Sequence, residues 1–481
     1  ELNIETFEYE ARKKLKAPSL EAAKQQKKSE RLRTLIYADD RAGTLLWNII
    51  APVLCYSAEK VGEIADDIVA IDQAMKWGFG WEQGPFELWD AIGVKQSVDK
   101  MEKEGRTVPS WVKEMLKAGN ETFYQKEAGN VTYYDRGQYK PLEENPKVIR
   151  LSQLKEQDRL ISKNAGASLI DLGDGVLNLE FHSTNNAIGL DVIQMINKAV
   201  DEVEQGDYQG LIIGNQGKNF CVGANLALML MEAQDDNFFE LELPVRQLQN
   251  AMMRIRYAEK PVVAAPFAMA LGGGAEVAMS AASIQASMET YIGLVEVGVG
   301  LIPGGGGSKE LYRRLLEGLP EGTNVDIQEV ANKAFETIAM AKVSSSAHEA
   351  IENGFLQKTD GITMNQDHLL YDAKQQVLHL AEKGYKPPKR EKIPVVGETG
   401  YATMLMGAQT MKYGGYISDY DFHIAKKLAN VIAGGKLPFG TKVDEQVLLD
   451  LEREAFLSLI GERKTQERMQ HMLVKGKPLR N

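Results

Sequence analysis

The chain has 481 residues, and at about 150 residues per domain this length predicts about three domains. Hydrophobic residues make up 44% and charged residues 26% of the chain, which excludes a disordered or fibrous protein. The net charge of −11 argues against nucleic acid or an anionic membrane surface as a partner. The two cysteines, Cys55 and Cys221, exclude a disulfide framework and indicate a reducing, cytoplasmic compartment.

The N-terminal third of the chain predicts mostly helices. Basic residues from Arg12 to Arg33 are typical of a solvated helical face, with a docking surface for a phosphate-bearing ligand as the alternative. Apolar residues at helical spacing then run from residue 45 to 75 and end at the glycine-rich segment 78–85. This segment reads G-x-G-x-x-x-G, but it follows a helix and its spacing differs from a dinucleotide fingerprint, so it predicts no nucleotide site.

A helix is predicted over residues 111–118, followed by a β-hairpin over 122–134 that turns at Gly129–Asn130 and by a charged linker over 142–163. From residue 165 strands alternate with helices, which predicts an α/β unit with repeated crossovers. The expected strands are 168–171, 176–181, 210–214 and 262–265, and the expected helices are 189–203 and 243–258. Beyond residue 389 the pattern is helical again, with an apolar stripe between 448 and 459.

Residues 261–288 form an apolar run in which Glu276 is the one charged residue. The run is long enough to cross a membrane. However, Pro266, the three glycines 272–274 and the central carboxylate would be costly in lipid, so no membrane span is expected. The run instead predicts a buried strand, a glycine turn and a buried helix that carries Glu276 into the protein core.

Two glycine-bearing turns are predicted to lie at the ends of parallel strands. Residues 220–225 follow the strand at 210–214, and residues 272–276 follow the strand at 262–265 and open a helix. Two backbone N–H groups that converge there would bind a carbonyl oxygen and stabilise the negative charge that it gains in a reaction, helped by the helix dipole. Alternatively, the glycines only permit tight turns between strand and helix.

Glu276 and Glu296 are both set in apolar segments, twenty residues apart. Burial raises the pKa of a carboxyl group, and proximity would separate the pair into one acid and one base that add water across a double bond. The alternative is a buried salt bridge, although the next basic residues, Lys309, Arg313 and Arg314, are predicted on a surface helix. The histidines show no metal-binding spacing, so no metal is expected.

With these residues the chain resembles the enoyl-CoA hydratase/isomerase (crotonase) superfamily over about residues 165–387. The matching segments are 185–187, 220–224, 270–276 and 296–304. The resemblance implies an α/β core built as a repeated ββα spiral, flanked by mostly α-helical domains. It implies that the amides of Ala224 and Gly273 form an oxyanion hole for a thioester carbonyl, and that Glu276 and Glu296 activate and deliver water. Val222, Asn225, Gly272 and Gly304 are expected to contact substrate, and the Gly304 amide to hold the water. Many relatives carry an acidic residue where Asn225 stands.

The flanking segments extend the resemblance. Residues 40–87 are similar to the C-terminal helical domain of 3-hydroxyacyl-CoA dehydrogenases, and residues 456–481 to the tail of bacterial fused dehydrogenase–hydratase proteins of fatty-acid β-oxidation. These similarities imply three domains, over 1–160, 161–390 and 391–481. In such fusions an NAD-binding domain precedes the helical domain. We find none in this sequence, and the first residue is Glu1, which implies a piece of a longer enzyme.

The expected function is hydration of a trans-2-enoyl-CoA to a 3-hydroxyacyl-CoA, in a fusion with an NAD-dependent 3-hydroxyacyl-CoA dehydrogenase. Hydration needs no cofactor, and NAD is expected only for the longer protein. The expected partners are acyl-CoA thioesters, a thiolase and further copies of the same chain. Two alternatives stay open, namely a Δ3-Δ2 enoyl-CoA isomerase and a non-catalytic acyl-CoA-binding scaffold.

Overall fold

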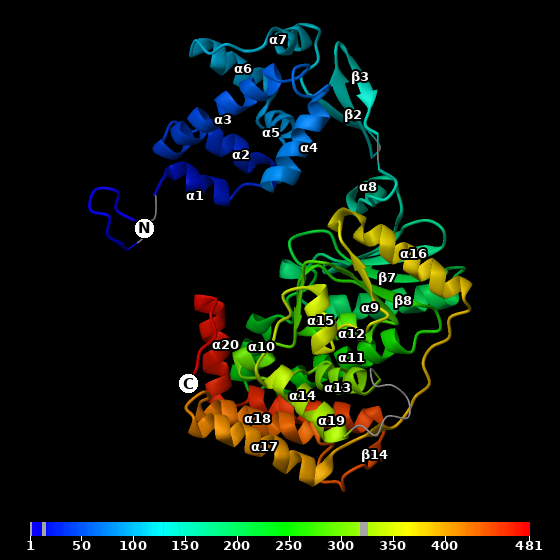
Figure 1. The fold of residues 1–481 in the computed structure, drawn as a ribbon. Helices are drawn as coiled ribbons and strands as arrows, with labels where there is room; N and C mark the ends of the chain where they lie inside the picture. Colours follow the sequence, from blue (N-terminus) through cyan, green and yellow to red (C-terminus); the bar gives the residue numbers. More distant parts are fainter. Residues whose placement is uncertain (1, 12–15, 128, 144, 318–325) are drawn as a thin grey trace. The chain divides into compact units, whose positions relative to one another are not determined.

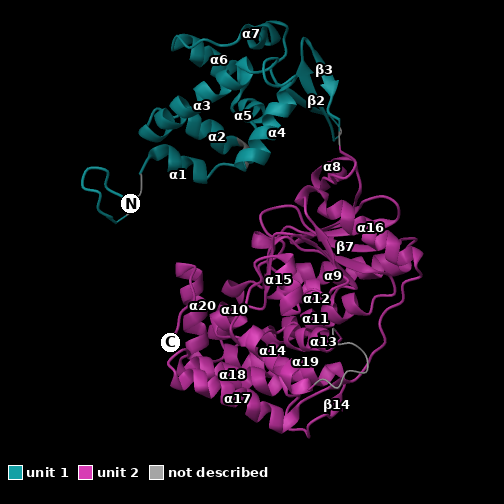
Figure 2. Cartoon of the chain, viewed as in Figure 1, with its two compact units in different colours: residues 1–144 teal, residues 145–481 magenta. Residues whose placement is uncertain are grey.

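The computed structural model describes residues 2–11, 16–127, 129–143, 145–317 and 326–481. The chain forms two compact units, which span residues 1–144 and 145–481 (Figure 2). Each unit has its own cluster of buried apolar side chains. The predicted division at residues 160 and 390 stays a prediction about domains, and the units are described separately below.

Unit 1 consists of helices followed by a small antiparallel sheet (Figure 1). Its elements are α1 (Pro18–Lys24), α2 (Lys28–Ile36), α3 (Arg41–Glu59), α4 (Ile68–Phe79), α5 (Pro85–Ile92), α6 (Val94–Lys103), α7 (Ser110–Lys117), β1 (Tyr124–Glu127), β2 (Asn130–Asp135) and β3 (Gln138–Pro141). The helix at 111–118 and the hairpin are confirmed, and β3 is a third strand that the sequence did not predict. Part of the predicted basic face, residues 12–15, lies outside the described residues.

The core of unit 1 is built from large aromatic side chains. Phe86, Trp89 and Phe123 are fully buried and pack against one another with ring centroids 5.0 and 5.3 Å from Phe123. The glycine-rich segment links α4 to α5, because Gly80 ends α4 in a left-handed conformation and Gly84 precedes α5. The segment is therefore a helix–helix connection, which confirms that it is not the strand–turn–helix of a dinucleotide site.

Unit 2 combines an α/β core with C-terminal helices (Figure 1). Its strands are β4 (Leu160–Lys163), β5 (Ala167–Asp171), β6 (Val176–Phe181), β7 (Gly210–Gly214), β8 (Val262–Ala265), β9 (Ala268–Leu271), β10 (Ser283–Ser287), β11 (Thr290–Gly293), β12 (Gly361–Thr363), β13 (Ile393–Pro394) and β14 (Lys442–Val443). Its α-helices are α8 (Leu151–Glu156), α9 (Leu190–Gln205), α10 (Leu226–Gln234), α11 (Phe238–Arg256), α12 (Gly273–Ser280), α13 (Gly307–Glu317), α14 (Ile327–Ala339), α15 (Ala347–Asn353), α16 (Leu369–Glu382), α17 (Gly397–Tyr413), α18 (Asp419–Ile432), α19 (Glu445–Ile460) and α20 (Arg463–Lys475). The 3₁₀ helices are η1 (Thr184–Asn186), η2 (Glu296–Val299) and η3 (Gln366–His368).

The main sheet of unit 2 has the strand order β12-β10-β8-β7-β6-β5-β4, and β6, β7, β8, β10 and β12 run parallel. A second parallel pair, β11-β9, lies outside this sheet. The chain therefore repeats a unit of one strand in each sheet followed by a helix: β8, β9 and α12, then β10, β11 and, after η2, α13. This arrangement confirms the predicted ββα spiral.

The predicted linker over 142–163 is wrong in its second half. Residues 151–156 form α8, and residues 160–163 form β4, which pairs antiparallel with β5. The charged side chains that suggested a linker belong to an edge strand and a short helix, both of which tolerate exposed charge on one side. The predicted strands and helices from 168 to 265 are confirmed, although α11 begins five residues before the expected start.

The C-terminal helices pack against the α/β core. Helix α19 contacts α11 and α13, α18 contacts α13 and α14, and α20 contacts α10 and η2. The predicted apolar stripe is confirmed on α19, where Leu448, Phe456 and Leu459 are buried. One charged residue of the same buried face, Glu452, is fully buried with them. Within the described ranges, no helix has the length and apolar character that a membrane crossing requires.

Candidate active site

The first glycine turn lies directly against β9. After β7 the chain reaches Cys221, whose N–H donates to Met269 O at 3.1 Å and whose carbonyl accepts from Leu271 N at 2.9 Å. Two residues later the turn contacts the segment before α9, because Gly223 O accepts a hydrogen bond from Ile188 N at 2.8 Å. These hydrogen bonds hold the segment that contains Val222, Gly223 and Ala224 in register with the end of β9.

The second glycine turn follows β9 and contacts the first. Gly272 has φ +55° and ψ −121°, a backbone conformation that side chains disfavour, and its N–H donates to Gly293 O at 2.9 Å. A Cβ on Gly223 would lie 3.9 Å from Gly273 N, and a Cβ on Gly273 would lie 3.8 Å from Gly223 Cα. The structure therefore brings the two predicted turns together.

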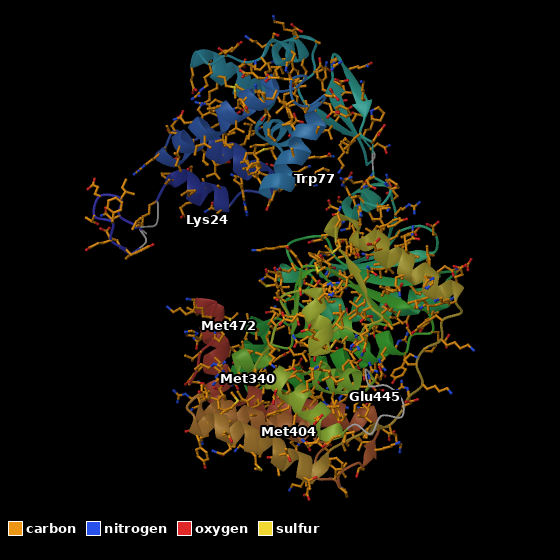
Figure 3. The ribbon with its side chains drawn as sticks, viewed as in Figure 1. Lys24, Trp77, Met340, Met404, Glu445 and Met472 are labelled. Carbon is orange, nitrogen blue, oxygen red and sulfur yellow. The ribbon has the colours of Figure 1, made fainter. Side chains whose placement is uncertain are left out.

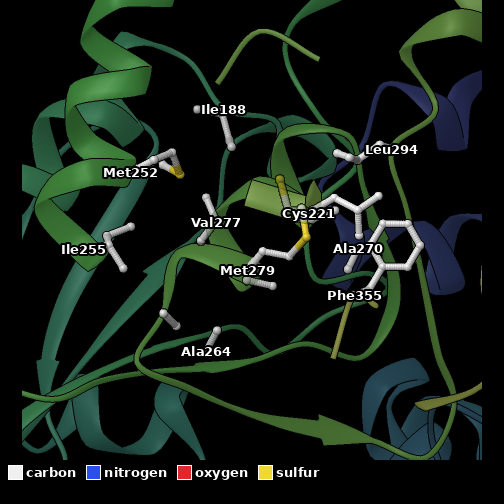
Figure 4. Close-up of a cluster of buried hydrophobic side chains, with 14 of the residues drawn as sticks. Ile188, Cys221, Met252, Ile255, Ala264, Ala270, Val277, Met279, Leu294 and Phe355 are labelled. Atoms are coloured by element: carbon white, nitrogen blue, oxygen red, sulfur yellow. The ribbon is translucent and has the colours of Figure 1, made fainter. Parts of the chain in front are cut away.

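Gly273 is the first residue of α12, where backbone amides have no acceptor inside the helix. In the described part of the chain, no backbone acceptor is found for the amides of Ala224 and Gly273. The helix behind them is buried along its whole length, among Ile188, Cys221, Ala270, Val277 and Leu294 (Figure 4). Two unpaired amides and the positive end of a buried helix dipole therefore point to one site that favours an oxyanion.

Glu276 lies in the first turn of α12 and is 3% exposed. Its Oε1 accepts two hydrogen bonds of 2.8 Å, from the amides of Gly305 and Gly307. Burial raises its pKa to about 7, against the opposing effects of the two amides and of Lys309. At neutral pH this carboxyl group is thus close to its midpoint, which suits a general base.

Glu296 opens the 3₁₀ helix η2 directly after β11. The residue is partly exposed, but its Oε2 is buried and has no hydrogen-bond partner among the described residues. A Cβ on Gly272 would lie 3.1 Å from Glu296 Oε1, so this carboxyl group borders the second glycine turn. Burial, followed by the negative charges of Glu276 and Glu452, raises the pKa of Glu296 well above its usual value. The raised pKa favours the protonated form of Glu296, which suits a general acid.

The expectation that Lys309, Arg313 and Arg314 lie on a surface helix is wrong. All three are at least nine-tenths buried on α13, which packs between α12, α14, α18 and α19. They are buried because each has a carboxylate partner: Lys309 pairs with Glu310 and Glu445, Arg313 with Glu310 and Glu317, and Arg314 with Asp360. Over the described residues, neither Glu276 nor Glu296 forms an ion pair, so the salt-bridge alternative finds no support there.

The remaining predicted contact residues lie around these groups. Asn225 is exposed, and its side chain caps α10 by accepting from Leu228 N at 3.2 Å. Gly304 is buried, and its carbonyl accepts from Gln249 Nε2 at 3.0 Å, whereas the amides that bind Glu276 belong to Gly305 and Gly307. The water-binding role of the Gly304 amide stays a prediction. Cys221 is fully buried, which raises the pKa of its thiol to about 12 and leaves it protonated.

One buried carboxyl group was missed by the sequence analysis. Glu452 from α19 accepts from Gly306 N at 2.6 Å and from Ser308 N at 2.8 Å. Burial and the nearby Glu276 raise its pKa to about 8. A signal was present, because Glu452 stands four residues from both Leu448 and Phe456 on the apolar stripe. A carboxylate on the buried face of a helix indicates a specific partner inside the core.

A cavity of about 390 Å³ lies beside η2 and is lined by Val297 and mainly by residues of α14, α17 and α18, with both apolar and charged side chains, the charged ones being Glu336, Lys342, Asp421 and Arg480. Met340 and Met404, labelled in Figure 3, are among its lining residues. Val297 directly follows Glu296, so the cavity borders the segment that carries one of the two carboxyl groups. Over the described ranges, no group of three or more His, Cys, Asp and Glu side chains could hold a metal ion.

The whole chain is similar to longer known proteins. The chain is 64% identical over 482 residues to a probable 3-hydroxyacyl-CoA dehydrogenase of Bacillus subtilis, covering 100% of this chain and 60% of that protein. It is 28% identical over 438 residues to a putative fatty acid oxidation complex trifunctional enzyme of Rickettsia felis, covering 91% of this chain and 54% of that protein. The chain thus spans less than two thirds of the length of these relatives.

The α/β core has its own relatives. An enoyl-CoA hydratase of Bacillus halodurans with a solved structure aligns with a TM-score of 0.44 at 16% identity, covering 64% of this chain and 99% of that one. Residues 171–360 match the family model described as enoyl-CoA hydratase/isomerase, and this range contains both glycine turns, Glu276 and Glu296. Residues 171–360 of this chain therefore resemble the enoyl-CoA hydratase/isomerase family, and unit 2 has a crotonase-like α/β fold.

Proposed function

We propose that unit 2 catalyses the addition of water to a trans-2-enoyl-CoA, which gives a 3-hydroxyacyl-CoA. The observation that carries this proposal is the pair of buried carboxyl groups, Glu276 and Glu296, on either side of the Gly272–Gly273 turn. Burial raises the pKa of both groups, and their mutual repulsion favours a state in which one carboxyl group is ionised and the other holds a proton. The match of residues 171–360 to the enoyl-CoA hydratase/isomerase family model supports the substrate class.

In the proposed reaction, Glu276 accepts a proton from water while the water oxygen forms a bond to C3 of the enoyl group. The π electrons of the C2–C3 bond move toward the thioester carbonyl, whose oxygen gains negative charge. The amides of Ala224 and Gly273 and the N-terminus of α12 stabilise this charge. Glu296 then donates its proton to C2, so that one water is added across the double bond and no cofactor is consumed.

The assignment of base and acid predicts the pH dependence of hydration. Glu276 must be ionised to accept a proton, and its pKa of about 7 in the ligand-free chain means that kcat/KM falls about tenfold per pH unit below pH 7. Glu296 must be protonated, so a second loss of kcat/KM is expected where the pH rises to its raised pKa. A pH profile of kcat/KM for crotonyl-CoA hydration checks this. A kcat/KM that stays constant from pH 7 down to pH 5 would contradict the role of Glu276.

The substrate assay also separates hydration from the two alternatives. Purified chain is incubated with 2-enoyl-CoA and 3-enoyl-CoA thioesters over a series of acyl chain lengths. Turnover of the 2-enoyl substrates to 3-hydroxyacyl-CoA supports the proposal. Turnover restricted to 3-enoyl substrates would identify an isomerase, and binding without turnover a scaffold. Chain-length preference would show whether the cavity beside Val297 is long enough to take an acyl tail.

We further propose that hydration is coupled, in the longer protein, to NAD-dependent oxidation of the 3-hydroxyacyl-CoA product. This proposal is supported by the similarity to the 3-hydroxyacyl-CoA dehydrogenase of Bacillus subtilis and the fatty acid oxidation enzyme of Rickettsia felis named above, and by the resemblance of residues 40–87 to a dehydrogenase helical domain. Fatty-acid β-oxidation supplies both substrate and product for such a pair, and a thiolase would consume the oxidised product. Self-association and a cytoplasmic location remain part of the same proposal.

The glycine-rich segment of unit 1, residues 78–85, predicts that this chain does not bind NAD. Because Gly80 and Gly84 connect two helices, they do not form the amide-lined strand–helix turn that binds a pyrophosphate. We therefore expect isothermal titration of NAD into this chain to show no binding at micromolar concentrations, while an acyl-CoA titrated into the same sample binds. Saturable NAD binding with a micromolar Kd would overturn this expectation.

A further inference from the structure

The turn before α13 donates its amides alternately to two carboxyl groups. The amides of Gly305 and Gly307 bind Glu276, and the amides of Gly306 and Ser308 bind Glu452. Glu276 comes from α12 in the α/β core, and Glu452 comes from α19 in the C-terminal helices. Four consecutive N–H groups are thus shared between one proposed catalytic carboxyl group and one carboxyl group with no assigned role.

This alternation depends on the backbone conformation of the turn. Gly306 has φ +108°, which side chains disfavour, and a Cβ there would lie 3.1 Å from a methyl carbon of Leu449. The conformation directs neighbouring amides to opposite sides, toward Glu276 and toward Glu452. Without an acceptor, the buried amides of Gly306 and Ser308 would be left unpaired, which costs free energy and favours a different turn. Glu452 thereby stabilises the conformation that presents the other two amides to Glu276.

We propose that Glu452 is a positioning residue of the hydratase site, which fixes the turn of residues 304–308 and thereby the carboxyl group of Glu276. The inference rests on the proposed hydration and adds to it a role for the C-terminal helices. Those helices complete the site, because α19 provides a side chain that holds a proposed catalytic group in place. Glu452 acts through the turn and needs no contact with the reacting atoms.

The electrostatics of the cluster provide a second, independent effect. Glu452 interacts electrostatically with Glu276 from α12 and with Glu296 from η2. Lys309 from α13 lowers the pKa of Glu276 and is itself paired with Glu310 and Glu445. The negative charge of Glu452 contributes to the raised pKa of Glu296. Above the pKa of Glu452 of about 8, where that charge is present, its removal lowers the pKa of Glu296, so the alkaline limb of the pH profile should move to lower pH. A residue that only stabilised the fold would not move this limb.

The test is Glu452→Gln in the full chain. Glutamine has the same shape, but it has one acceptor oxygen, and its NH₂ group would face one of the two amide donors. We expect kcat for crotonyl-CoA to fall about 10- to 100-fold, since a small displacement of a reacting group has effects of this size, while KM changes less than about threefold. Glu452→Asp keeps the charge but is too short for both amides, and it should show a smaller loss and an unmoved alkaline limb.

Glu445→Gln is the matched control. Glu445 stands two turns earlier on α19 (Figure 3), pairs with Lys309 and Tyr257, and touches neither the turn nor Glu276. The Glu445→Gln substitution removes a carboxylate that ties the same helix to Lys309, so a lower Tm is expected, with kcat within about threefold of wild type. If Glu445→Gln and Glu452→Gln lower kcat equally for equal loss of Tm, Glu452 has only a structural role.

Hydrogen exchange of the 304–308 amides separates this inference from the proposed function. We expect these amides to exchange at least about tenfold faster in Glu452→Gln than in wild type or Glu445→Gln, because one of them loses its buried acceptor and the turn is held less firmly. If wild-type chain hydrates no enoyl-CoA, the proposed function fails, whatever the exchange rates are. If hydration is present and Glu452→Gln leaves kcat, the alkaline limb and amide exchange unchanged, the positioning role is wrong.

Discussion

Glu276→Gln and Glu296→Gln are each expected to lower kcat for hydration of crotonyl-CoA by at least about a hundredfold, the usual scale for a positioned acid or base. Glutamine at position 276 can still accept the amides of Gly305 and Gly307, but it cannot take a proton from water at neutral pH. Glutamine at position 296 preserves the shape next to Gly272 but has no acidic proton to deliver to C2.

The measurement is steady-state hydration over pH 5 to 10, with the thermal midpoint recorded for each variant. Glu276→Gln should also remove the acid limb near pH 7, because the group that titrates there is gone. Both variants should fold at least as well as wild type, since each removes a buried ionisable group. Glu289→Gln is the control, because Glu289 is an exposed carboxylate between β10 and β11. Rates close to wild type in both active-site variants would refute the two-carboxylate mechanism.

Gly272→Ala is expected to have the next largest effect, with a loss of about a hundredfold in kcat. Gly272 has φ +55°, so alanine there costs about 1–3 kcal/mol of backbone strain. Its Cβ would also lie 3.1 Å from Glu296 Oε1 and 3.6 Å from Gly223 Cα. The 3.6 Å separation is an ordinary van der Waals contact, but the 3.1 Å approach to Glu296 is tight. Together with the backbone strain, its relief should move the proposed acid or the Gly272 turn, whose next residue, Gly273, provides one of the amides that would bind the oxyanion.

Gly298→Ala is the matched control for this substitution. Gly298 lies in η2 two residues after Glu296, its φ is not positive, and a Cβ there meets no atom within 4 Å. We expect Gly298→Ala to keep kcat within about threefold of wild type. Comparable losses in the two variants would show that any alanine near η2 disturbs the site, and would contradict the specific role of the Gly272 turn.

Much of the α/β core could be predicted because its signals are local. Buried parallel strands appear as short apolar runs, and a glycine pair followed by a carboxylate marks a strand–turn–helix junction. The positions of β7, β8, α9 and α12 follow from such patterns, as does the expectation of two carboxyl groups in apolar surroundings. The charged segment at 151–163 was misjudged because edge strands and short helices carry the same residues as linkers.

Contacts between distant parts of the chain could not be predicted in this way. Lys309, Arg313 and Arg314 have the sequence pattern of a solvated helix face, yet each is buried, because carboxylates from α13, α19 and the segment before β12 neutralise them. A charged residue in a sequence suggests an exposed side chain, but a partner of opposite charge elsewhere in the chain allows that side chain to be buried. Glu452 could not be predicted for the same reason, because the amides that it accepts from, those of Gly306 and Ser308, lie 146 and 144 residues away in the sequence.

The sequence by itself determined the fold class, the two glycine turns and the presence of two carboxyl groups in apolar segments, because each depends on a few neighbouring residues. Only the tertiary structure decided that the turns touch at Gly223 and Gly273, that Glu276 is held by Gly305 and Gly307, and that a helix from the C-terminal end completes the cluster. These features are contacts between side chains and amides that are distant in the sequence, and a local sequence pattern does not determine such contacts.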